Sequence, residues 1–594
     1  MRGLVGWLAL LLLSCGGPPA SRPRVIVLAL DGCDPQVLRR LLDQGKLPHF
    51  ARLRSLGGFW ELGTTTPPQS PVAWATFLTG QDPGGHGLFD FLQRDPQRLQ
   101  PVTSMSRVAE GEYRRQLGAP PFWTYLNQRQ VPATLLRVPC WFPAAPDQAR
   151  TLTGLGTPDL LGSYGTFSYY SEEEPEHPLS GGTWVRVEPR GGEVQASLIG
   201  PEQQACPLHL RLDTRNGQAL IEVGEPESQP FLLKQGEWSG WIPVAFPKTR
   251  GMVRFLLRSV KPLALYVSPL NDDPTRPQLP LSNPPTLAAR LARQCGRYHT
   301  QGMAEESKAL SAQVISDPDY LAQSSEVLAE NRRLLTQGLR DFTQGFFFFY
   351  VSHLDLQSHL FWRKPEEVER AYGRADEMLA GVLSQLDAET TLWVVSDHGF
   401  APFERVFDLN AWLAEQGWLR SQPDQPLEQI DWAGTRAYAV GFNGLYLNLR
   451  GREARGTQDP AQSDRLKREL TAKLLALRDP ANGRRVVRQV YDSRLIYTSA
   501  YREQAPDLVI GYERGYRVAW ETALGQRSGL VFRDNLDHWN GDHLIDPQLV
   551  PGVLLCSRPI RRENPSLKDL APTILKQFQV APPPAMTGRN LLED

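Results

Sequence analysis

Short apolar runs that alternate with amphipathic helical patterns constrain the fold of this chain most strongly. The first run, residues 25–30, stops at Asp31-Gly32. Similar runs recur at residues 132–138, 346–351, 392–395 and 553–556. A helical pattern at residues 366–386 places its apolar side chains on one face. Continuous apolar strands separated by helices are typical of parallel sheets covered on both faces. We therefore predict an α/β core with a mostly parallel central sheet flanked by helices.

Residues 181–284 have a different pattern, because short β-prone pieces there are separated by Gly, Pro and Asn turns. We predict that they form a mainly β insertion or cap, and that residues 22–180 and 285–594 form the α/β core. The charge is balanced, with 64 Lys and Arg against 65 Asp and Glu. This balance argues against a disordered acidic chain and against a basic nucleic-acid binder, so we expect no specific nucleic-acid binding.

The N-terminus has the pattern of an export signal. Arg2 precedes an apolar run at residues 4–13 that is too short to span a bilayer as a mature helix. The run ends in Leu12-Leu13-Ser14-Cys15, which resembles the bacterial lipobox. The alternative is an ordinary signal peptide with a chance cysteine. We predict a lipoprotein signal peptide at residues 1–15 and lipidation of Cys15, which attaches the exported chain to a lipid bilayer. Since Gly16 follows the cysteine, the predicted location is the outer membrane or the periplasmic face of a bacterial cell.

Acidic and imidazole side chains follow three of the predicted strands, and another imidazole comes late in the chain. These candidate ligands are Asp31, Asp355, His359, Asp397, His398 and His543. In an open parallel sheet, ligands gather at the carboxyl ends of the strands. Asp355 and His359 are four residues apart, so on a helix they point in the same direction. Mixed Asp and His ligands suit zinc or another divalent transition metal better than calcium.

The order of these motifs resembles the alkaline phosphatase superfamily and, within it, the type I phosphodiesterase/nucleotide pyrophosphatase branch. The strand-Asp-Gly opening, Asp-x-x-x-His, Asp-His-Gly and a late Gly-Asp-His occur in the family's order, over roughly residues 24–180 and 285–590. The resemblance implies an alkaline-phosphatase-like fold and two divalent metal ions, zinc or alternatively manganese. It assigns one ion to Asp355, His359 and His543. His538 is the alternative to His543 as the third ligand of this ion. It assigns the other ion to Asp31, Asp397 and His398.

The same resemblance requires a Ser or Thr nucleophile, which also binds metal, at the start of a helix. Counting back from Thr79-Gly80, this position falls on Ser70, and the threonines at residues 64–66 are the alternatives. From local pattern alone, Ser70 is interpreted as an N-cap that precedes Pro71. The family's Asn three residues after the nucleophile is missing, because Ala73 stands there. Either another donor replaces it, with Asn443 as the predicted residue that binds the substrate, or the substrate class differs from that of the nucleotide pyrophosphatases.

The resemblance therefore implies a two-metal phosphoric ester hydrolase that acts on a small phosphorylated substrate. The first hypothesis is a phosphodiesterase or nucleotide pyrophosphatase-like enzyme with a phospho-seryl intermediate on Ser70. The alternatives are a phosphomonoesterase or phospho-headgroup transferase of the same superfamily, and a surface lipoprotein that uses the fold as a binding module. The presence of all six ligands and the nucleophile favours an enzyme. A sulfatase is disfavoured, because Ser70-Pro71 does not fit the C/S-x-P-x-R signature.

Overall fold

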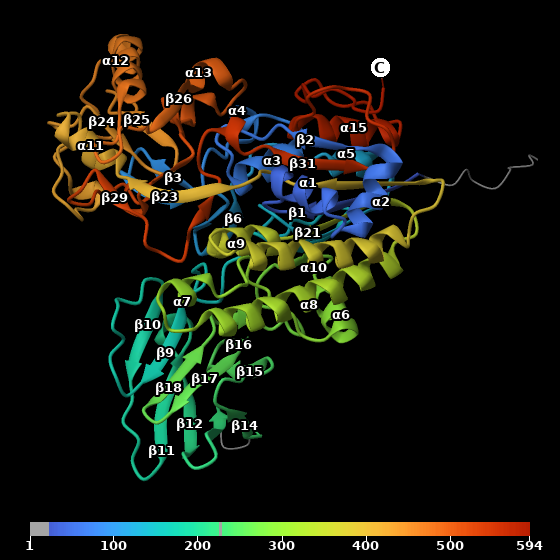
Figure 1. Cartoon of the computed structure of the whole chain (residues 1–594), viewed down its shortest axis with the longest axis vertical. Coiled ribbons are helices and arrows are strands. Elements are labelled where there is room, and N and C mark those ends of the chain that lie inside the picture. The colour runs from blue at the N-terminus through green and yellow to red at the C-terminus, as the bar shows by residue number, and fades with distance from the viewer. Residues whose placement is uncertain (1–22, 225–228, 594) are drawn as a thin grey trace, which may run out of the picture.

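The computed structural model describes residues 23–224 and 229–593 (Figure 1). Its centre is an eight-stranded sheet with the order β2-β31-β22-β1-β21-β7-β8-β20. The five neighbouring strands from β22 to β8 are parallel, and the three strands at the edges are antiparallel to their neighbours. The predicted fold class is confirmed. The strands are β1 (Arg24–Leu30), β2 (Phe59–Leu62), β7 (Ala133–Val138), β8 (Arg150–Thr153), β20 (Ser282–Asn283), β21 (Gly345–Val351), β22 (Thr390–Val395) and β31 (Gly552–Cys556).

Helices cover both faces of this sheet, which explains why inner strands such as β21 and β31 are apolar throughout. In β1, Ile26 and Leu28 belong to one hydrophobic core, whereas Val25 and Val27 belong to the core on the other face. The first core includes α1 (Pro35–Asp43), α2 (Pro48–Gly57), α6 (Leu287–Cys295), α8 (Asp317–Asp341) and α10 (Pro365–Leu383). The second includes α3 (Ser70–Thr79), α5 (Trp123–Gln128) and α15 (Leu570–Gln577).

A β-rich unit with its own hydrophobic core lies below the central sheet, next to α7 (Ser307–Ser311) and α8 (Figure 1). Strand β9 (Phe167–Ser171) lies before residue 181 but pairs with β10 and β18 of this unit. The unit therefore begins earlier than the predicted insertion. Its other strands are β10 (Gly182–Arg186), β11 (Glu193–Ile199), β12 (Ala205–Asp213), β13 (Gln218–Val223), β14 (Phe231–Lys234), β15 (Ile242–Ala245), β16 (Arg250–Val253), β17 (Phe255–Val260), β18 (Leu263–Val267) and β19 (Asn271–Asp272).

A second peripheral region, drawn in orange in Figure 1, has its own core and was not separated by the sequence patterns. One of its sheets has the order β24-β25-β27-β26, and in the other β23 pairs with β28, β29 and β30. The strands are β23 (Ala401–Phe407), β24 (Ala437–Ala439), β25 (Gly444–Leu447), β26 (Val487–Asp492), β27 (Leu508–Tyr512), β28 (Gly515–Val518), β29 (Phe532–Asp534) and β30 (Gly541–Asp542). The main helices are α11 (Leu409–Glu415), α12 (Ser463–Ala476) and α14 (Trp520–Ala523).

The predicted signal peptide at residues 1–15 and its Cys15 lie outside the described residues. Within residues 23–224 and 229–593, no helix combines the length and the apolar character that crossing a membrane requires.

Candidate metal centre and nucleophile

The carboxyl ends of three neighbouring parallel strands carry most of the predicted ligands. β22, β1 and β21 lie side by side in the sheet. Asp31 follows β1 directly, and Asp397 lies just beyond the end of β22. β21 leads into α9 (His353–Phe361), which carries Asp355 and His359 one turn apart. Because these strands are parallel, their ligands meet at one edge of the sheet.

His543 reaches this edge from a segment far along the chain. It directly follows β30, which pairs with the start of β23 so that Asp542 faces Ala401. Since β23 begins shortly after His398, this pairing brings the two histidines together. Their rings are stacked with centroids 3.5 Å apart.

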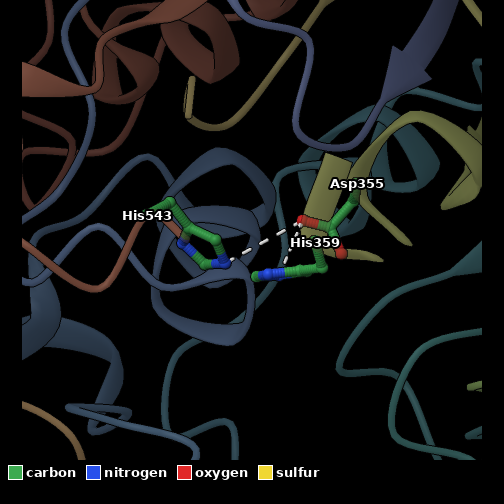
Figure 2. Close-up of side chains that lie close together, drawn as sticks. All are labelled: Asp355, His359 and His543. Atoms are coloured by element: carbon green, nitrogen blue, oxygen red, sulfur yellow. Dashed lines mark ion pairs between the residues drawn. The ribbon is translucent and has the colours of Figure 1, made fainter. Parts of the chain in front are cut away.

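Asp355, His359 and His543 form the first ligand group (Figure 2). Oδ1 of Asp355 lies 3.4 Å from Nε2 of His359 and 3.8 Å from Nε2 of His543. The Nδ1 atoms of His359 and His543 lie 2.8 and 2.7 Å from the carbonyl oxygens of Gly541 and Pro68. A carbonyl only accepts, so Nδ1 of each ring carries the hydrogen. Both Nε2 atoms are therefore left with a lone pair for a metal.

Asp31, Asp397 and His398 form the second ligand group. Nε2 of His398 lies 3.2 Å from Oδ2 of Asp397 and 3.5 Å from Oδ1 of Asp31. Its Nδ1 is 3.1 Å from the carbonyl oxygen of Gly399, which again leaves Nε2 as the acceptor. Within each group, the possible ligand atoms lie within 4.8 Å of one another. Nε2 of His398 is also 3.9 Å from Oδ1 of Asp355, so the two groups are adjacent.

Ser70 is the first residue of α3 and faces the second group. Its Oγ lies 3.3 Å from Oδ1 of Asp31 and 3.1 Å from Nε2 of His398. The N-cap of α3 is Gln69, so the interpretation of Ser70 as an N-cap is wrong by one residue. Thr65, one of the alternative nucleophiles, instead donates its hydroxyl to a backbone carbonyl. The structure thus places Ser70 next to the candidate ligands.

Three carboxylates converge here without a basic partner: those of Asp31 and Asp397 are buried, and that of Asp355 is 13% exposed. In the described part of the chain, no Lys or Arg forms an ion pair with Asp31, Asp355 or Asp397, whose charged contacts are to histidines. Oδ1 of Asp355 and Oδ2 of Asp397 are buried and have no hydrogen-bond partner there. An uncompensated buried charge costs on the order of several kcal/mol. The residues therefore fit two divalent cations, and an Asp and His donor set suits zinc.

Burial dominates the protonation of these side chains. It raises the pKa of Asp31 to about 7, with a further contribution from Asp355, and it raises the pKa of Asp355 to about 7. Burial lowers the pKa of His359 and of His543 to about 4. The two imidazoles are therefore neutral at pH 7, as metal coordination requires, while a nearby cation would favour the ionised carboxylates.

Gly32 occupies a position that admits no side chain. Its φ is +66°, and an added Cβ would lie 2.7 Å from the Cα of Asp355 and 2.6 Å from the ring of Phe400.

Gly45 is a matched control, because its φ is +69° and an added Cβ would meet nothing within 4 Å. Gly45→Ala should lower the free energy of unfolding by about 1–2 kcal/mol through backbone strain. Gly32→Ala should lower it by roughly 1–3 kcal/mol more through overpacking. Denaturant unfolding of both variants tests this, and equal losses would contradict it.

Asn443, predicted to bind the substrate, is fully engaged by the protein. It is buried, and its Oδ1 accepts a hydrogen bond of 2.8 Å from Nε2 of Gln69. Its Nδ2 donates to the carbonyls of Ile510 and Leu544 at 2.9 and 3.2 Å. The structure corrects this prediction: Asn443 ties Gln69, the residue before Ser70, to the second peripheral region. The sequence could not show this, because every partner is distant along the chain.

Two aromatic donors that the sequence analysis missed hold Asp31 in place. Oη of Tyr350 and Nε1 of Trp74 donate to its Oδ2 at 2.6 and 2.9 Å. A signal for Trp74 exists in the sequence, since it lies one helical turn after the candidate nucleophile. A third missed residue, Trp539, stacks on the ring of His359 with centroids 3.7 Å apart.

A cavity of about 330 Å³ lies over the site. Asp31, Ser70 and the first ligand group all line it. Most of the remaining lining is apolar or aromatic and includes Phe91, Met105, Phe442, Trp520 and Trp539. A lining that combines the polar ligand groups with mostly apolar and aromatic side chains fits a substrate that carries an organic group.

The chain matches the family model described as type I phosphodiesterase/nucleotide pyrophosphatase over residues 25–200 and 283–530. Most of the unmatched stretch between these ranges lies in the β-rich unit. No curated protein matches the chain significantly. Phosphonoacetate hydrolase from Sinorhizobium meliloti 1021, solved with phosphonoformate, aligns with a TM-score of 0.47 at 12% identity, over 94% of this chain and 96% of that one. Murine ectonucleotide pyrophosphatase/phosphodiesterase 5, solved with AMP, aligns with a TM-score of 0.43 at 12% identity, over 96% of this chain and 100% of that one.

Proposed function

This chain belongs to the type I phosphodiesterase/nucleotide pyrophosphatase family, and on that premise we propose that it is a metal-dependent phosphodiesterase with Ser70 as its nucleophile. The family supports the coarser activity, hydrolysis of phosphoric esters. One observation carries the finer proposal. Oγ of Ser70 lies within 3.3 Å of Asp31 and His398 in the second ligand group, and the first group is adjacent to the second.

In the proposed mechanism, Ser70 is phosphorylated and then regenerated. Two bound divalent ions, zinc or alternatively manganese, would act as Lewis acids toward the phosphate oxygens. Oδ1 of Asp31 accepts a hydrogen bond from the Ser70 hydroxyl and orients its Oγ. Oγ loses its proton to solvent and attacks phosphorus, and the bond between phosphorus and the leaving oxygen breaks. That oxygen departs with the bonding electrons and takes up a proton from solvent. Water then attacks the phospho-seryl intermediate, which breaks the bond between Oγ and phosphorus and restores the hydroxyl.

The groups around Ser70 have two roles in the proposed mechanism: they would hold the metal ions, and they stabilise negative charge on Oγ. One ion would be held by Asp355, His359 and His543, and the other by Asp31, Asp397 and His398. The N-terminus of α3 favours negative charge on Oγ, since Ser70 is its first residue. Ala73 and the fully bonded Asn443 leave the phosphate without a neutral amide donor at either position. This departure favours a second candidate, a phosphomonoesterase or phospho-headgroup transferase that uses the same intermediate.

A substrate panel tests the proposal. Aryl phosphate monoesters, aryl phosphate diesters and aryl sulfates are assayed with added zinc, manganese or magnesium. We expect the diesters to react fastest with zinc or manganese. Faster monoester hydrolysis would favour the second candidate. Metal-loaded protein that hydrolyses none of the esters would favour a binding module, the remaining alternative.

Metal binding should release protons below pH 7. Burial raises the pKa of Asp31 and Asp355 to about 7, so below that pH both carboxyl groups hold protons that a cation must displace. Zinc affinity should therefore fall as the pH is lowered from 8 to 5.5. His359 stays neutral over this range, because its pKa is about 4. Calorimetric titration in buffers of different ionisation enthalpy counts the protons. A count at pH 6 that is no larger than the count at pH 8.5 would contradict the prediction.

We also propose that the exported protein is anchored by lipid on Cys15, at the outer membrane or the periplasmic face. Cys15→Ser should remove the lipid and shift the protein from the detergent phase to the aqueous phase. Activity should remain, because the α/β core starts only at Arg24 with β1. Mass spectrometry of the N-terminal peptide is the measurement. An unacylated Cys15 in the mature protein, or a mature N-terminus at another residue, would refute the anchor.

A further inference from the structure

Arg517 is a buried cation beside the cavity that the proposed mechanism does not use. It lies on β28, is 1% exposed and lines the same cavity as Ser70. Its guanidinium carbon is 3.8 Å from the ring centroid of Trp520 and 4.7 Å from that of Phe442. Because a guanidinium is planar and stacks on aromatic rings, these two contacts restrict its orientation.

Asp542 compensates the charge of Arg517 on one side. Nε of Arg517 lies 2.8 Å from Oδ2 of Asp542. The same carboxylate accepts hydrogen bonds from Nε1 of Trp539 at 2.9 Å and from the backbone N–H of His543 at 2.8 Å. This pairing makes burial of the cation tolerable. It also connects Arg517 to the candidate ligand His543.

The other side of the guanidinium is unsatisfied. Nη2 and Nε of Arg517 are both buried without a hydrogen-bond partner among residues 23–224 and 229–593, and whereas Nε still forms its ion pair with Asp542, Nη2 has no polar contact there. Nη1 makes only a long contact of 3.4 Å with the carbonyl of Val518. Buried polar groups are normally paired, so an orphaned donor needs an explanation. A guanidinium beside a substrate cavity is suited to a carboxylate or a phosphate oxygen.

We propose that Arg517 is a specificity residue whose Nη2 binds an oxyanion of the substrate. The oxyanion is a non-bridging oxygen of the reacting phosphoryl group or a second acidic group on the same molecule. Ala73 and Asn443 supply no amide donor for the phosphate, and Arg517 provides a charged donor in the same cavity. The inference rests on the proposed function, because it takes this cavity as the substrate site.

The test compares Arg517→Met with wild type in the zinc-loaded full chain. Arg436→Met is the matched control, because Arg436 also stacks on a tryptophan, at 3.9 Å from the ring centroid of Trp418, but does not line the cavity. Binding of inorganic phosphate is measured by calorimetry, together with zinc content. Hydrolysis is measured with two aryl phosphate diesters that differ only in a carboxylate on the ring.

The two sources of the oxyanion give different results. If Arg517 binds the reacting phosphoryl group, Arg517→Met should weaken phosphate binding and lower kcat/KM for both diesters about 10- to 100-fold, the scale of a lost hydrogen bond to a charged group. If it binds a second acidic group, only the carboxylated diester should lose kcat/KM. In both cases, zinc content should be unchanged, and added guanidinium should restore part of the loss in Arg517→Ala.

Two results would overturn the proposal. One is unchanged phosphate binding together with unchanged kcat/KM for both diesters. The other is a loss of zinc in Arg517→Met, which would make Arg517 a support for His543 through Asp542. A wild-type protein that hydrolyses neither diester would refute the proposed function instead. In that case, binding measured by calorimetry decides the role of Arg517, and equal affinity of wild type and Arg517→Met for both inorganic phosphate and the carboxylated diester would overturn it.

Discussion

Replacing Ser70 with alanine should slow phosphodiester hydrolysis at least about a thousandfold, which corresponds to roughly 4 kcal/mol of activation free energy. The variant lacks the only hydroxyl that the structure places at hydrogen-bond distance from both Asp31 and His398 in the described residues. It should keep its fold, because Gln69 is the N-cap of α3 and no capping hydrogen bond is lost. Turnover, zinc content and thermal unfolding of the same preparation are the measurements.

Ser463→Ala is the matched control for this change. Ser463 is also a buried serine at the first position of a helix, α12, and it does not line the cavity. It should retain full activity. A chirally labelled substrate adds an independent readout, because two in-line displacements through a phospho-seryl intermediate retain configuration at phosphorus. Inversion, or a Ser70→Ala enzyme with near-normal turnover, would show that water attacks the substrate directly.

Replacing His543 with alanine should remove one of two bound ions and slow hydrolysis at least about a hundredfold. Groups that only orient a metal ligand contribute about 10- to 100-fold, so loss of the ligand itself should reach at least the upper end of that range. Nε2 of His543 lies 3.8 Å from Oδ1 of Asp355 and has the lone pair that a metal needs. The ion at Asp355 and His359 should therefore be lost first. Metal content per chain and turnover are the measurements.

His538→Ala is the control for this second change. His538 was the rival ligand in the sequence, but its side chain is 35% exposed and its Nε2 is 3.7 Å from Asp317 rather than from a ligand group. This variant should keep both ions and its full rate. The assignment is wrong if His538→Ala loses metal and rate while His543→Ala keeps them.

The apolar strands of the central sheet were predictable from the sequence for a local reason, whereas the division of the candidate ligands into two groups came from the family resemblance. A strand that is buried on both faces must be apolar throughout, so the runs at β1, β21 and β22 are visible without any tertiary contact. The residues that follow these strands share one edge once the strands are parallel. The groups Asp355, His359 and His543, and Asp31, Asp397 and His398, are the ones that the structure brings together. The resemblance to the type I phosphodiesterase/nucleotide pyrophosphatase family is also confirmed.

The sequence alone thus determined the α/β class and the strand ends that carry the candidate ligands, because these depend on residue order and on patterns within single elements, whereas the choice of Ser70 came from the family resemblance. Only the tertiary structure decided which polar side chains are available to a ligand. Asn443 and Arg517 are both buried, yet Asn443 has its hydrogen bonds filled by distant backbone and side-chain groups, whereas Nη2 of Arg517 has none in the described chain. Hydrogen-bond satisfaction depends on partners that packing brings together from remote segments, and no local pattern records it.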